Sequence, residues 1–440
     1  MQDGRLRFES IVILNITMKL LLARILLSNV FLFSISASAD NWPAWRGPQG
    51  MGVSKEKQLP LRWSRTENVQ WRTPLPERGN STPVVWDDSI FVTQAIEKEG
   101  RRTLMCFNRA DGHLRWQSGV AYPEKEVTHA TNPYCSASPV TDGERVIASF
   151  GSAGLFCYDF NGKEIWRRDL GKQAHIWGNA ASPVIYGDLC ILNFGPGERT
   201  FLIALDKRTG KTIWQHDEPD GKFGESSSDW NGSWSTPIIE TIGGQTQIIM
   251  SYPKRVCALD PKTGREFWSC RGLTALVYTS PLYDNGVVVA MSGFSGSALA
   301  VKMEGLMIGD ITEDRLWLHP KAKQRIGSGV IHDGHIFISS DAGVAECFEL
   351  KTGKLVWEER LAGPGPTASS WSSMVLADGK VYSVNQSGDA FVLKASPKFE
   401  LLSTNSIGEK TLASLAVSDG QIFVRTYQNL WCVGDRKRSR

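Results

Sequence analysis

Residues 181–194 read ASPVIYGDLCILNF, and residues 201–214 read FLIALDKRTGKTIW. Together they form one unit, which opens with a small residue and a proline and closes with a tryptophan. Between these ends lie short runs in which apolar and other residues alternate, a pattern typical of antiparallel strands. Gly210 stands in the last turn, where it supplies the positive φ that a tight hairpin needs. The unit therefore predicts four short antiparallel strands.

This unit recurs along the chain. From Pro83 to Leu415, seven intervals average about 47 residues each. The units open at Ser81-Thr82-Pro83, Ser138-Pro139, Ser182-Pro183, Ser235-Thr236-Pro237, Ser280-Pro281, Ser328-Gly329, Ser373-Met374 and Ser414-Leu415. They close at Trp71, Trp116, Trp166, Trp214, Trp268, Trp317 and Trp357, with Leu401 in the equivalent place once.

Eight units of four strands predict an all-β fold, an eight-bladed β-propeller of four-stranded antiparallel blades. A single blade cannot bury both of its faces, whereas a closed ring buries each face against a neighbour. The last unit has three strands, within residues 414–419, 421–427 and 429–435. Residues 68–72 supply the missing one, so an N-terminal strand is expected to close the ring. We expect the closing tryptophans to pack between blades.

The N-terminus indicates export. Lys19 precedes an apolar stretch that ends at Ala37-Ser38-Ala39, a small-x-small cleavage signal before Asp40. Arg24 interrupts the stretch, which favours a signal peptide over a membrane anchor. We expect a signal peptide with an upstream extension over 1–39, with Met18 favoured over Met1 as the start. An N-terminal Trp-rich arm over 40–64, a propeller over 65–435 and a basic tail over 436–440 complete the expected organisation.

Composition excludes several classes. The 49 Lys and Arg nearly balance the 46 Asp and Glu, so the basic footprint of a nucleic-acid-binding protein is missing. The hydrophobic content of 41% is too high for a disordered chain. Beyond the N-terminus no apolar run approaches about 18 residues, so no transmembrane segment is expected in the mature chain. We expect a monomer in the periplasm, in the cell envelope or outside the cell.

The motif Ala-x-Asp-x-x-Thr-Gly-x-x-x-Trp occurs at residues 204–214 and again at residues 258–268. It resembles the PQQ-like repeat of quinoprotein alcohol dehydrogenases and of the propeller subunit of the outer-membrane barrel assembly machinery. The sequence NWPAWRGP, residues 41–48, resembles the leader of secreted bacterial PQQ-binding-like β-propeller repeat proteins. The resemblance covers residues 41–434. It implies the fold, but that family includes both enzymes and non-enzymatic scaffolds.

The resemblance also implies what an enzyme of this kind would carry. Quinoprotein dehydrogenases hold PQQ in the funnel of the ring, with a disulfide between adjacent cysteines, a Trp floor, a Ca²⁺ ion bound by Glu and Asn, and a catalytic Asp. Here the closest cysteines, Cys257 and Cys270, are thirteen positions apart, and no C-x-x-C-H haem motif occurs. No Ca²⁺ ligand set can be placed by motif. We therefore expect no catalytic residue and no resident cofactor, with PQQ plus Ca²⁺ kept as the alternative.

The eight cysteines indicate core positions. Cys106 and Cys347 share one place in the third strand of their units, and Cys157 and Cys432 fit the same place. Because Ala204 stands there in another unit, the place is predicted to be a small buried site. A disulfide among three further cysteines stays open in an oxidising compartment. These are Cys135, Cys190 and Cys270.

The candidate binding site lies in the loops that precede the first strand of a unit. In a propeller that strand lines the central channel, and two of these loops are long, from Trp116 to Ser138 and from Trp214 to Ser235. Side chains converging there would form a polar pocket with aromatic walls, suited to a sugar, a peptide turn or a planar cofactor. Alternatively, the loops pack on themselves. The candidates are His129, Asn132, Tyr134, His175, Trp177, Asn179, Asp229, Trp230, Asn231, Trp234 and Trp371.

No metal site is predicted, since no spacing such as H-x-x-x-H occurs, and no G-x-S-x-G hydrolase motif is present. The function expected from the sequence is that of an exported, non-enzymatic binding or scaffolding propeller. Its partner would be an envelope protein or a small polar ligand, and no nucleic acid. The alternative is a PQQ-dependent oxidoreductase with a divergent site. For the arm, we expect Trp42 and Trp45 to pack on the ring exterior near the closing blade.

Overall fold

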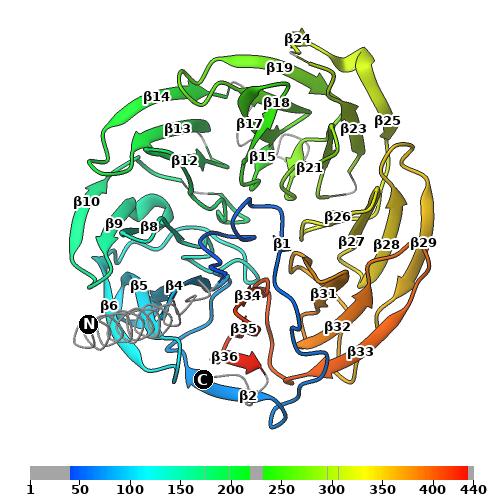
Figure 1. The fold of residues 1–440 in the computed structure, drawn as a ribbon. Helices are drawn as coiled ribbons and strands as arrows, with labels where there is room; N and C mark the ends of the chain where they lie inside the picture. Colours follow the sequence, from blue (N-terminus) through cyan, green and yellow to red (C-terminus); the bar gives the residue numbers. More distant parts are fainter. Residues whose placement is uncertain are drawn as a thin grey trace, which may run out of the picture. The chain divides into compact units, whose positions relative to one another are not determined.

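The structure is a computed structural model that describes residues 40–434 except 174, 198, 219–230, 295 and 306. The predicted signal peptide and basic tail lie outside these residues. Within the described part of the chain, no helix is long and apolar enough to cross a membrane. Residues 40–434 form the ring of blades seen in Figure 1.

Eight four-stranded antiparallel blades make up the ring, which confirms the predicted fold (Figure 1). The strands are named from the innermost outward. Blade 1 consists of β3 (Val84–Trp86), β4 (Ser89–Ile96), β5 (Arg101–Asn108) and β6 (Leu114–Ala121). Blade 2 consists of β7 (Val140–Thr141), β8 (Arg145–Ser149), β9 (Leu155–Asp159) and β10 (Glu164–Arg168). Blade 3 consists of β11 (Val184–Tyr186), β12 (Leu189–Phe194), β13 (Phe201–Asp206) and β14 (Thr212–Asp217). Blade 4 consists of β16 (Ile238–Ile242), β17 (Gln245–Tyr252), β18 (Arg255–Leu259) and β19 (Glu266–Arg271).

The second half of the ring continues in the same way. Blade 5 consists of β21 (Leu282–Asp284), β22 (Val287–Met291), β23 (Ala298–Lys302) and β25 (Arg315–His319). Blade 6 consists of β26 (Val330–His332), β27 (His335–Ser339), β28 (Val344–Glu349) and β29 (Leu355–Arg360). Blade 7 consists of β30 (Val375–Ala377), β31 (Lys380–Val384), β32 (Asp389–Lys394) and β33 (Leu401–Ser406). Blade 8 consists of β34 (Ala416–Ser418), β35 (Gln421–Arg425), β36 (Asn429–Gly434) and the N-terminal β2 (Val69–Pro74).

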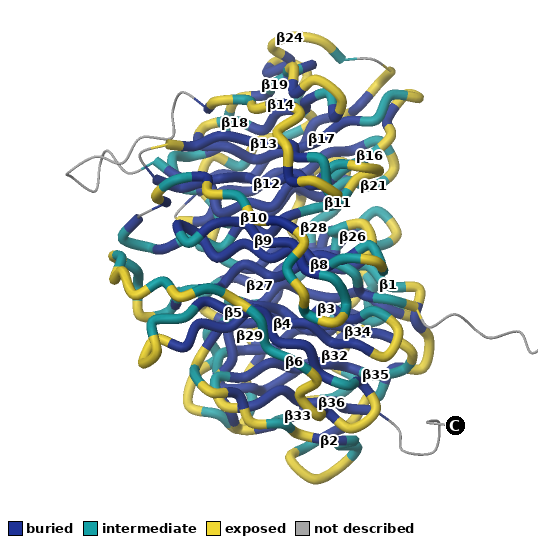
Figure 2. Tube along the Cα trace, turned by 90° about the vertical axis from the view of Figure 1, so that its left-hand side faces the viewer, coloured by how far each residue is buried: buried dark blue, intermediate teal, exposed yellow. Residues whose placement is uncertain are grey.

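The N-terminal strand closes the ring. β2 pairs antiparallel with β36, with Val69 opposite Val433 and Thr73 opposite Leu430. The strand predicted to complete the last blade therefore does so. Figure 2 shows middle strands such as β4, β9 and β12 as buried, whereas turns, loops and outer strands such as β6 are more exposed.

The closing tryptophans join neighbouring blades, as predicted. The indole N–H of Trp116 in blade 1 donates to the carbonyl of Phe160 in blade 2, at 2.8 Å, and the indole ring covers Gly162 of the same turn. Because a Cβ on Gly162 would come within 2.6 Å of the indole, the turn glycine makes room for the ring. The equivalent indole bonds run from Trp71 to Arg109, Trp166 to Lys207, Trp214 to Pro261, Trp317 to Leu350 and Trp357 to Ser396.

Trp268 is the exception. Its indole N–H donates to Gln247 Oε1 of its own blade, at 2.8 Å. Between the third and fourth strands of blade 5, the short glycine turn is replaced by a longer connection that contains β24 (Gly309–Asp310). β24 pairs in parallel with β19, opposite Trp268, so a strand takes the place that the turn occupies elsewhere.

The cysteine position faces the closing tryptophan across the two outer strands. Cys106 lies opposite Trp116, and Ala204 lies opposite Trp214 in blade 3. Cys157, Cys347 and Cys432 occupy the same register. A small side chain leaves space for the indole, which explains why Ala and Cys alternate there. All eight cysteines of the chain are buried and free, so no disulfide joins Cys135, Cys190 or Cys270.

A closed ring of hydrogen bonds, here called the hydroxyl girdle, links the residues that open the units. The peptide N–H of each residue donates to the hydroxyl of the next blade, and Ser414 closes the circle by donating to Thr82 Oγ1 at 3.2 Å. All these residues are buried. The girdle runs through Thr82, Ser138, Ser182, Thr236, Ser280, Ser328, Ser373 and Ser414.

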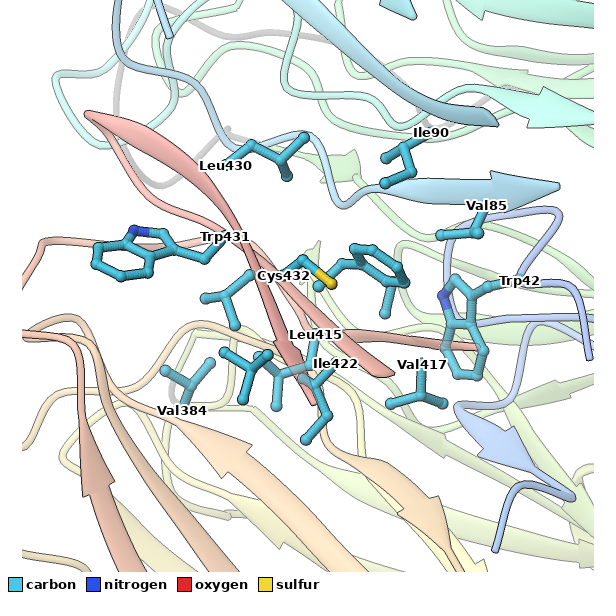
Figure 3. Close-up of a cluster of buried hydrophobic side chains, with 14 of the residues drawn as sticks. Trp42, Val85, Ile90, Val384, Leu415, Val417, Ile422, Leu430, Trp431 and Cys432 are labelled. Carbon is cyan, nitrogen blue, oxygen red and sulfur yellow. The ribbon is translucent and has the colours of Figure 1, made fainter. Parts of the chain in front are cut away.

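The N-terminal arm crosses the ring in Figure 1. Trp42 exchanges two backbone hydrogen bonds with Val85, each of 2.9 Å, and is buried with blades 1, 7 and 8, as Figure 3 shows beside Val417. Further along, β1 (Val53–Ser54) pairs in parallel with β30. The Glu56 carboxylate then accepts the peptide N–H of Gly420 at 2.9 Å. The arm thus joins blade 1 to blades 7 and 8.

Candidate functional site

The central channel holds a cavity of about 200 Å³. Part of its wall is the hydroxyl girdle, since Thr82, Ser138, Ser182, Ser373 and Ser414 line it. The remaining lining residues come from the loops that precede the innermost strands, from the β22–β23 connection and from the arm. They are Trp45, Asn80, Thr131, Asn132, Ser136, Trp177, Ala180, Trp234, Tyr278, Phe294, Gln324, Ile326, Trp371 and Leu412.

A second ring of side chains lies two residues before the girdle in every blade. An extended chain places side chains two residues apart on the same side, so both positions face the channel. In blades 1 to 3 this ring is small or polar, with Asn80, Ser136 and Ala180. In blades 4 to 8 it is large and mostly apolar, with Trp234, Tyr278, Ile326, Trp371 and Leu412. We call the side of this ring formed by blades 1 to 3 the polar wall and the side formed by blades 4 to 8 the apolar wall; Trp177, in the loop before blade 3, also lines the cavity.

Trp45 enters the channel from the opposite end. The arm contacts the ends of innermost strands: the Asp87 N–H, just after β3, donates to Asn41 Oδ1 at 2.7 Å, and the N–H of Thr141, the last residue of β7, donates to Pro43 O at 2.8 Å. Trp234, by contrast, lies in the loop that precedes the innermost strand of its blade, β16, and therefore at the other end of the channel. The expectation of exterior packing is thus wrong for Trp45, which lines the cavity. Trp42 does pack near the closing blade, but it is buried and bonded to the innermost strand β3 and does not lie on the exterior.

Hydrogen bonds between loops hold the aromatic wall in position. The indole N–H of Trp234 donates to Gly178 O at 2.8 Å, and that of Trp371 donates to Asp341 Oδ1 at 2.5 Å. The loops before blades 4 and 5 also pair in parallel, through β15 (Gly232–Ser233) and β20 (Leu276–Val277). The rings are therefore oriented before any ligand arrives, which lowers the entropic cost of binding.

Two predicted histidines lie behind the aromatic wall and do not line the cavity. The His129 ring packs 4.4 Å from the Trp177 ring, and the His175 ring meets Trp234 edge-on at 5.1 Å. His175 Nδ1 accepts the peptide N–H of Trp177 at 3.1 Å. Burial lowers the pKa of His175 from 6.5 to about 4, so the imidazole is neutral at pH 7.

The polar wall carries amide groups. Asn132 lines the cavity, and its Nδ2 donates to Trp177 O at 2.6 Å. The Nδ2 of Asn80 donates to Thr131 O at 2.8 Å. Its Oδ1 is buried and has no hydrogen-bond partner among the described residues. An acceptor without a partner here favours a ligand that brings a hydrogen-bond donor.

The other predicted residues lie elsewhere. The Tyr134 hydroxyl donates to Glu126 O at 2.5 Å within its own loop, and Arg102 lies 3.9 Å from the centre of the Tyr134 ring. Asn179 packs against Gly151 in the β8–β9 connection, and its Nδ2 donates to Gln173 O of its own loop at 3.4 Å. Asn231 is half-buried outside the cavity lining. Asp229 and Trp230 lie outside the described residues. The structure thus brings together Asn132, Trp177, Trp234 and Trp371 from the predicted set.

Sequence reasoning missed several lining residues. Tyr278 and Ile326 precede the girdle by two positions in blades 5 and 6. The loops before these blades are short, and the prediction was based on long loops. The constant offset from the opening Ser or Thr was the signal that could have found them, together with Asn80 and Leu412. No periodic signal pointed to Trp45, because the arm occurs once.

The cavity residues do not fit PQQ with Ca²⁺. PQQ carries three carboxyl groups, and Ca²⁺ takes six to eight oxygen ligands that include carboxylates. Every cavity-lining residue that the structure describes is uncharged. The described residues also contain no group of three His, Cys, Asp or Glu side chains placed to hold a metal ion. The free cysteines likewise form no disulfide against which a planar cofactor could pack.

Comparisons with known proteins agree with the architecture. BamB from Moraxella catarrhalis is 15% identical, with a TM-score of 0.59 over 84% of this chain and 98% of that chain. A europium-containing methanol dehydrogenase is 11% identical, with a TM-score of 0.65 over 89% and 90%. Quinohemoprotein alcohol dehydrogenase from Comamonas testosteroni is 13% identical, with a TM-score of 0.63 over 92% and 82%. These likenesses show a shared fold.

The sequence alone does not match any curated protein. A family model described as outer membrane protein assembly factor BamB, however, matches residues 61–195, 101–359, 310–395 and 341–438. These segments cover most of the chain and run through all eight blades. The chain therefore belongs to this BamB-like family of PQQ-like repeat β-propellers.

Proposed function

We propose that the protein is an exported, non-enzymatic binding protein of the periplasm or cell envelope, which holds its ligand in the channel cavity. The observation that carries this proposal is the cavity itself, which is lined by pre-oriented aromatic side chains together with hydroxyl and amide groups. Pockets that combine apolar walls with a few placed polar groups are typical of ligand sites. The ligand is a small molecule or a segment of an envelope protein.

The envelope location rests on two supports. One is the predicted signal peptide, which lies outside the described residues. The other is the family description, which names an outer-membrane assembly factor.

The fold is shared by dehydrogenases, so an oxidoreductase is the competing proposal. The uncharged lining argues against it, because anionic carboxylates that lose water without gaining a cation or enough donors are strongly disfavoured. A redox role would also need a group that accepts electrons, and the cavity lining does not fit PQQ.

The test is to incubate the purified mature chain, residues 40–440, with PQQ and Ca²⁺, remove free cofactor by desalting, and record the absorbance spectrum. Alcohol oxidation with an artificial electron acceptor is then assayed on the same sample. We expect no retained quinone absorbance and no dye reduction above a heat-denatured control. Retained absorbance together with turnover would replace the binding proposal by the oxidoreductase.

A further inference from the structure

The two walls of the cavity differ in a way that selects a class of ligand. The large side of the second ring lies in blades 4 to 8 and the small, polar side in blades 1 to 3. We propose that the cavity binds the neutral pyranose unit of a glycan. This inference rests on the proposed binding function and names its ligand class.

The apolar wall suits the face of a sugar ring. A pyranose chair presents C–H groups on its faces and hydroxyls around its edge, so it can lie on an aromatic ring while its edge is hydrogen-bonded. Trp371 and Tyr278 are partly exposed to the cavity, and Phe294 is 55% exposed beside them. Trp45 adds a further indole from the arm. Trp177, from the loop before blade 3, also lines the cavity, so aromatic faces are available to a sugar ring from several blades.

The hydroxyl and amide groups of the cavity lining would be satisfied by a ligand that both donates and accepts hydrogen bonds. Each of the five girdle hydroxyls in the cavity accepts a peptide N–H, and among the described residues none has an acceptor for its own proton. The buried Oδ1 of Asn80 has the opposite need, a donor. A sugar hydroxyl satisfies both kinds of group, because it carries one proton and two lone pairs. Asn132 and Gln324 place further amides in the same cavity.

The uncharged lining and the small volume of the cavity limit which sugars it can bind. No described lining residue bears a charge, so a uronic acid or a sugar phosphate would lose water around its charge without gaining a counter-charge. The volume of about 200 Å³ is below the roughly 300–1,000 Å³ of pockets that enclose drug-sized ligands. One ring therefore fits inside, and the rest of a glycan would extend past Phe294 into solvent.

The experiment titrates the mature chain with four neutral trisaccharides, cellotriose, maltotriose, mannotriose and triacetylchitotriose, while tryptophan fluorescence is followed. Trigalacturonic acid serves as the charged probe of equal length. We expect saturable binding of at least one neutral trisaccharide and none of trigalacturonic acid. Trp371→Ala should weaken that binding by about tenfold or more, and Trp371→Phe should restore part of it.

A matched control removes an aromatic side chain from the other end of the channel. Tyr186 ends β11 and is 39% exposed, so Tyr186→Ala should leave the affinity unchanged. Thermal melting of each variant shows whether it folds. Trp371→Phe keeps the aromatic face, so it reports on the site even if Trp371→Ala fails to fold.

Three results would overturn the inference: no saturable signal with any neutral trisaccharide, equal binding of trigalacturonic acid, or unchanged binding in Trp371→Ala. If a capped leucine–phenylalanine–leucine tripeptide binds where the sugars do not, the ligand is an apolar peptide and the binding function stands. Retention of PQQ with turnover would instead remove the binding function itself.

Discussion

The opening Ser or Thr of each unit serves two purposes. Its hydroxyl accepts the peptide N–H of the previous blade, and in five blades the same hydroxyl faces the cavity. Thr82 matters most for the ring, because it joins the last blade to the first. Thr82 and Ser414 are both buried residues.

Replacing Thr82 by valine, which has nearly the same shape, should therefore destabilise the ring. The Ser414 N–H loses its acceptor at a buried site, and the expected loss is about 1–3 kcal/mol in the free energy of unfolding. Urea unfolding of the mature chain measures it. Thr82→Ser keeps the hydroxyl and should lose much less, and equal losses in both variants would show that the hydrogen bond is not the cause.

His175 makes stability depend on pH. Burial lowers its pKa from 6.5 to about 4, so between these values the unfolded chain binds a proton that the folded chain does not. Its contribution to stability is thus complete above about pH 6.5 and is lost as the pH falls towards 4. Protonation of Nδ1 would also break the bond from the Trp177 N–H.

The expected loss between pH 7 and pH 4 reaches up to about 3 kcal/mol, because each pKa unit corresponds to about 1.4 kcal/mol. Carboxylates also titrate in this range, so wild type is compared with His175→Asn, which keeps an acceptor for Trp177 and does not titrate. Unfolding free energies at both pH values measure the difference. Identical pH dependence in the two proteins would contradict the role given to His175.

At the scale of the element, the blade contact is a tryptophan packed on a glycine turn. Gly162 has φ of 81°, and its missing Cβ is what allows the Trp116 indole to cover the turn. Gly187 also has a positive φ, of 55°, but nothing lies within 4 Å of its Cβ position. Alanine substitutions at Gly187 and Gly162 therefore separate two losses of stability: the one due to the positive φ, and the one due to the contact with the Trp116 indole.

Gly187→Ala should lose roughly 1 kcal/mol from the strained backbone alone. Gly162→Ala should lose the same amount and, in addition, about 1–3 kcal/mol from overpacking against the indole. Chemical denaturation of the two variants gives the comparison. If both lost the same amount, the indole would not press on the turn, and the blade contact would be looser than described.

At the scale of the whole molecule, the repeat was enough to predict the ring. The spacing of the closing tryptophans gave the blade number, and the missing strand of the last unit located β2. Each of these features recurs or leaves a gap in a recurring pattern, so periodicity reveals it. The residues that line the cavity could be predicted from the sequence only in part. Trp45 reaches the cavity through an arm that occurs once, and Tyr134 turns back into its own loop, where a local hydrogen bond with Glu126 outweighs exposure to the channel.

The central claim is that the channel of the ring holds a cavity whose described lining is uncharged and combines aromatic with hydroxyl and amide side chains. The most direct test is calorimetric titration of the mature chain, residues 40–440, with PQQ in the presence of Ca²⁺. The account predicts no saturable heat. Micromolar or tighter binding that is lost in Trp234→Ala would contradict it, because that result would place an anionic redox cofactor against the wall assigned here to a neutral ligand.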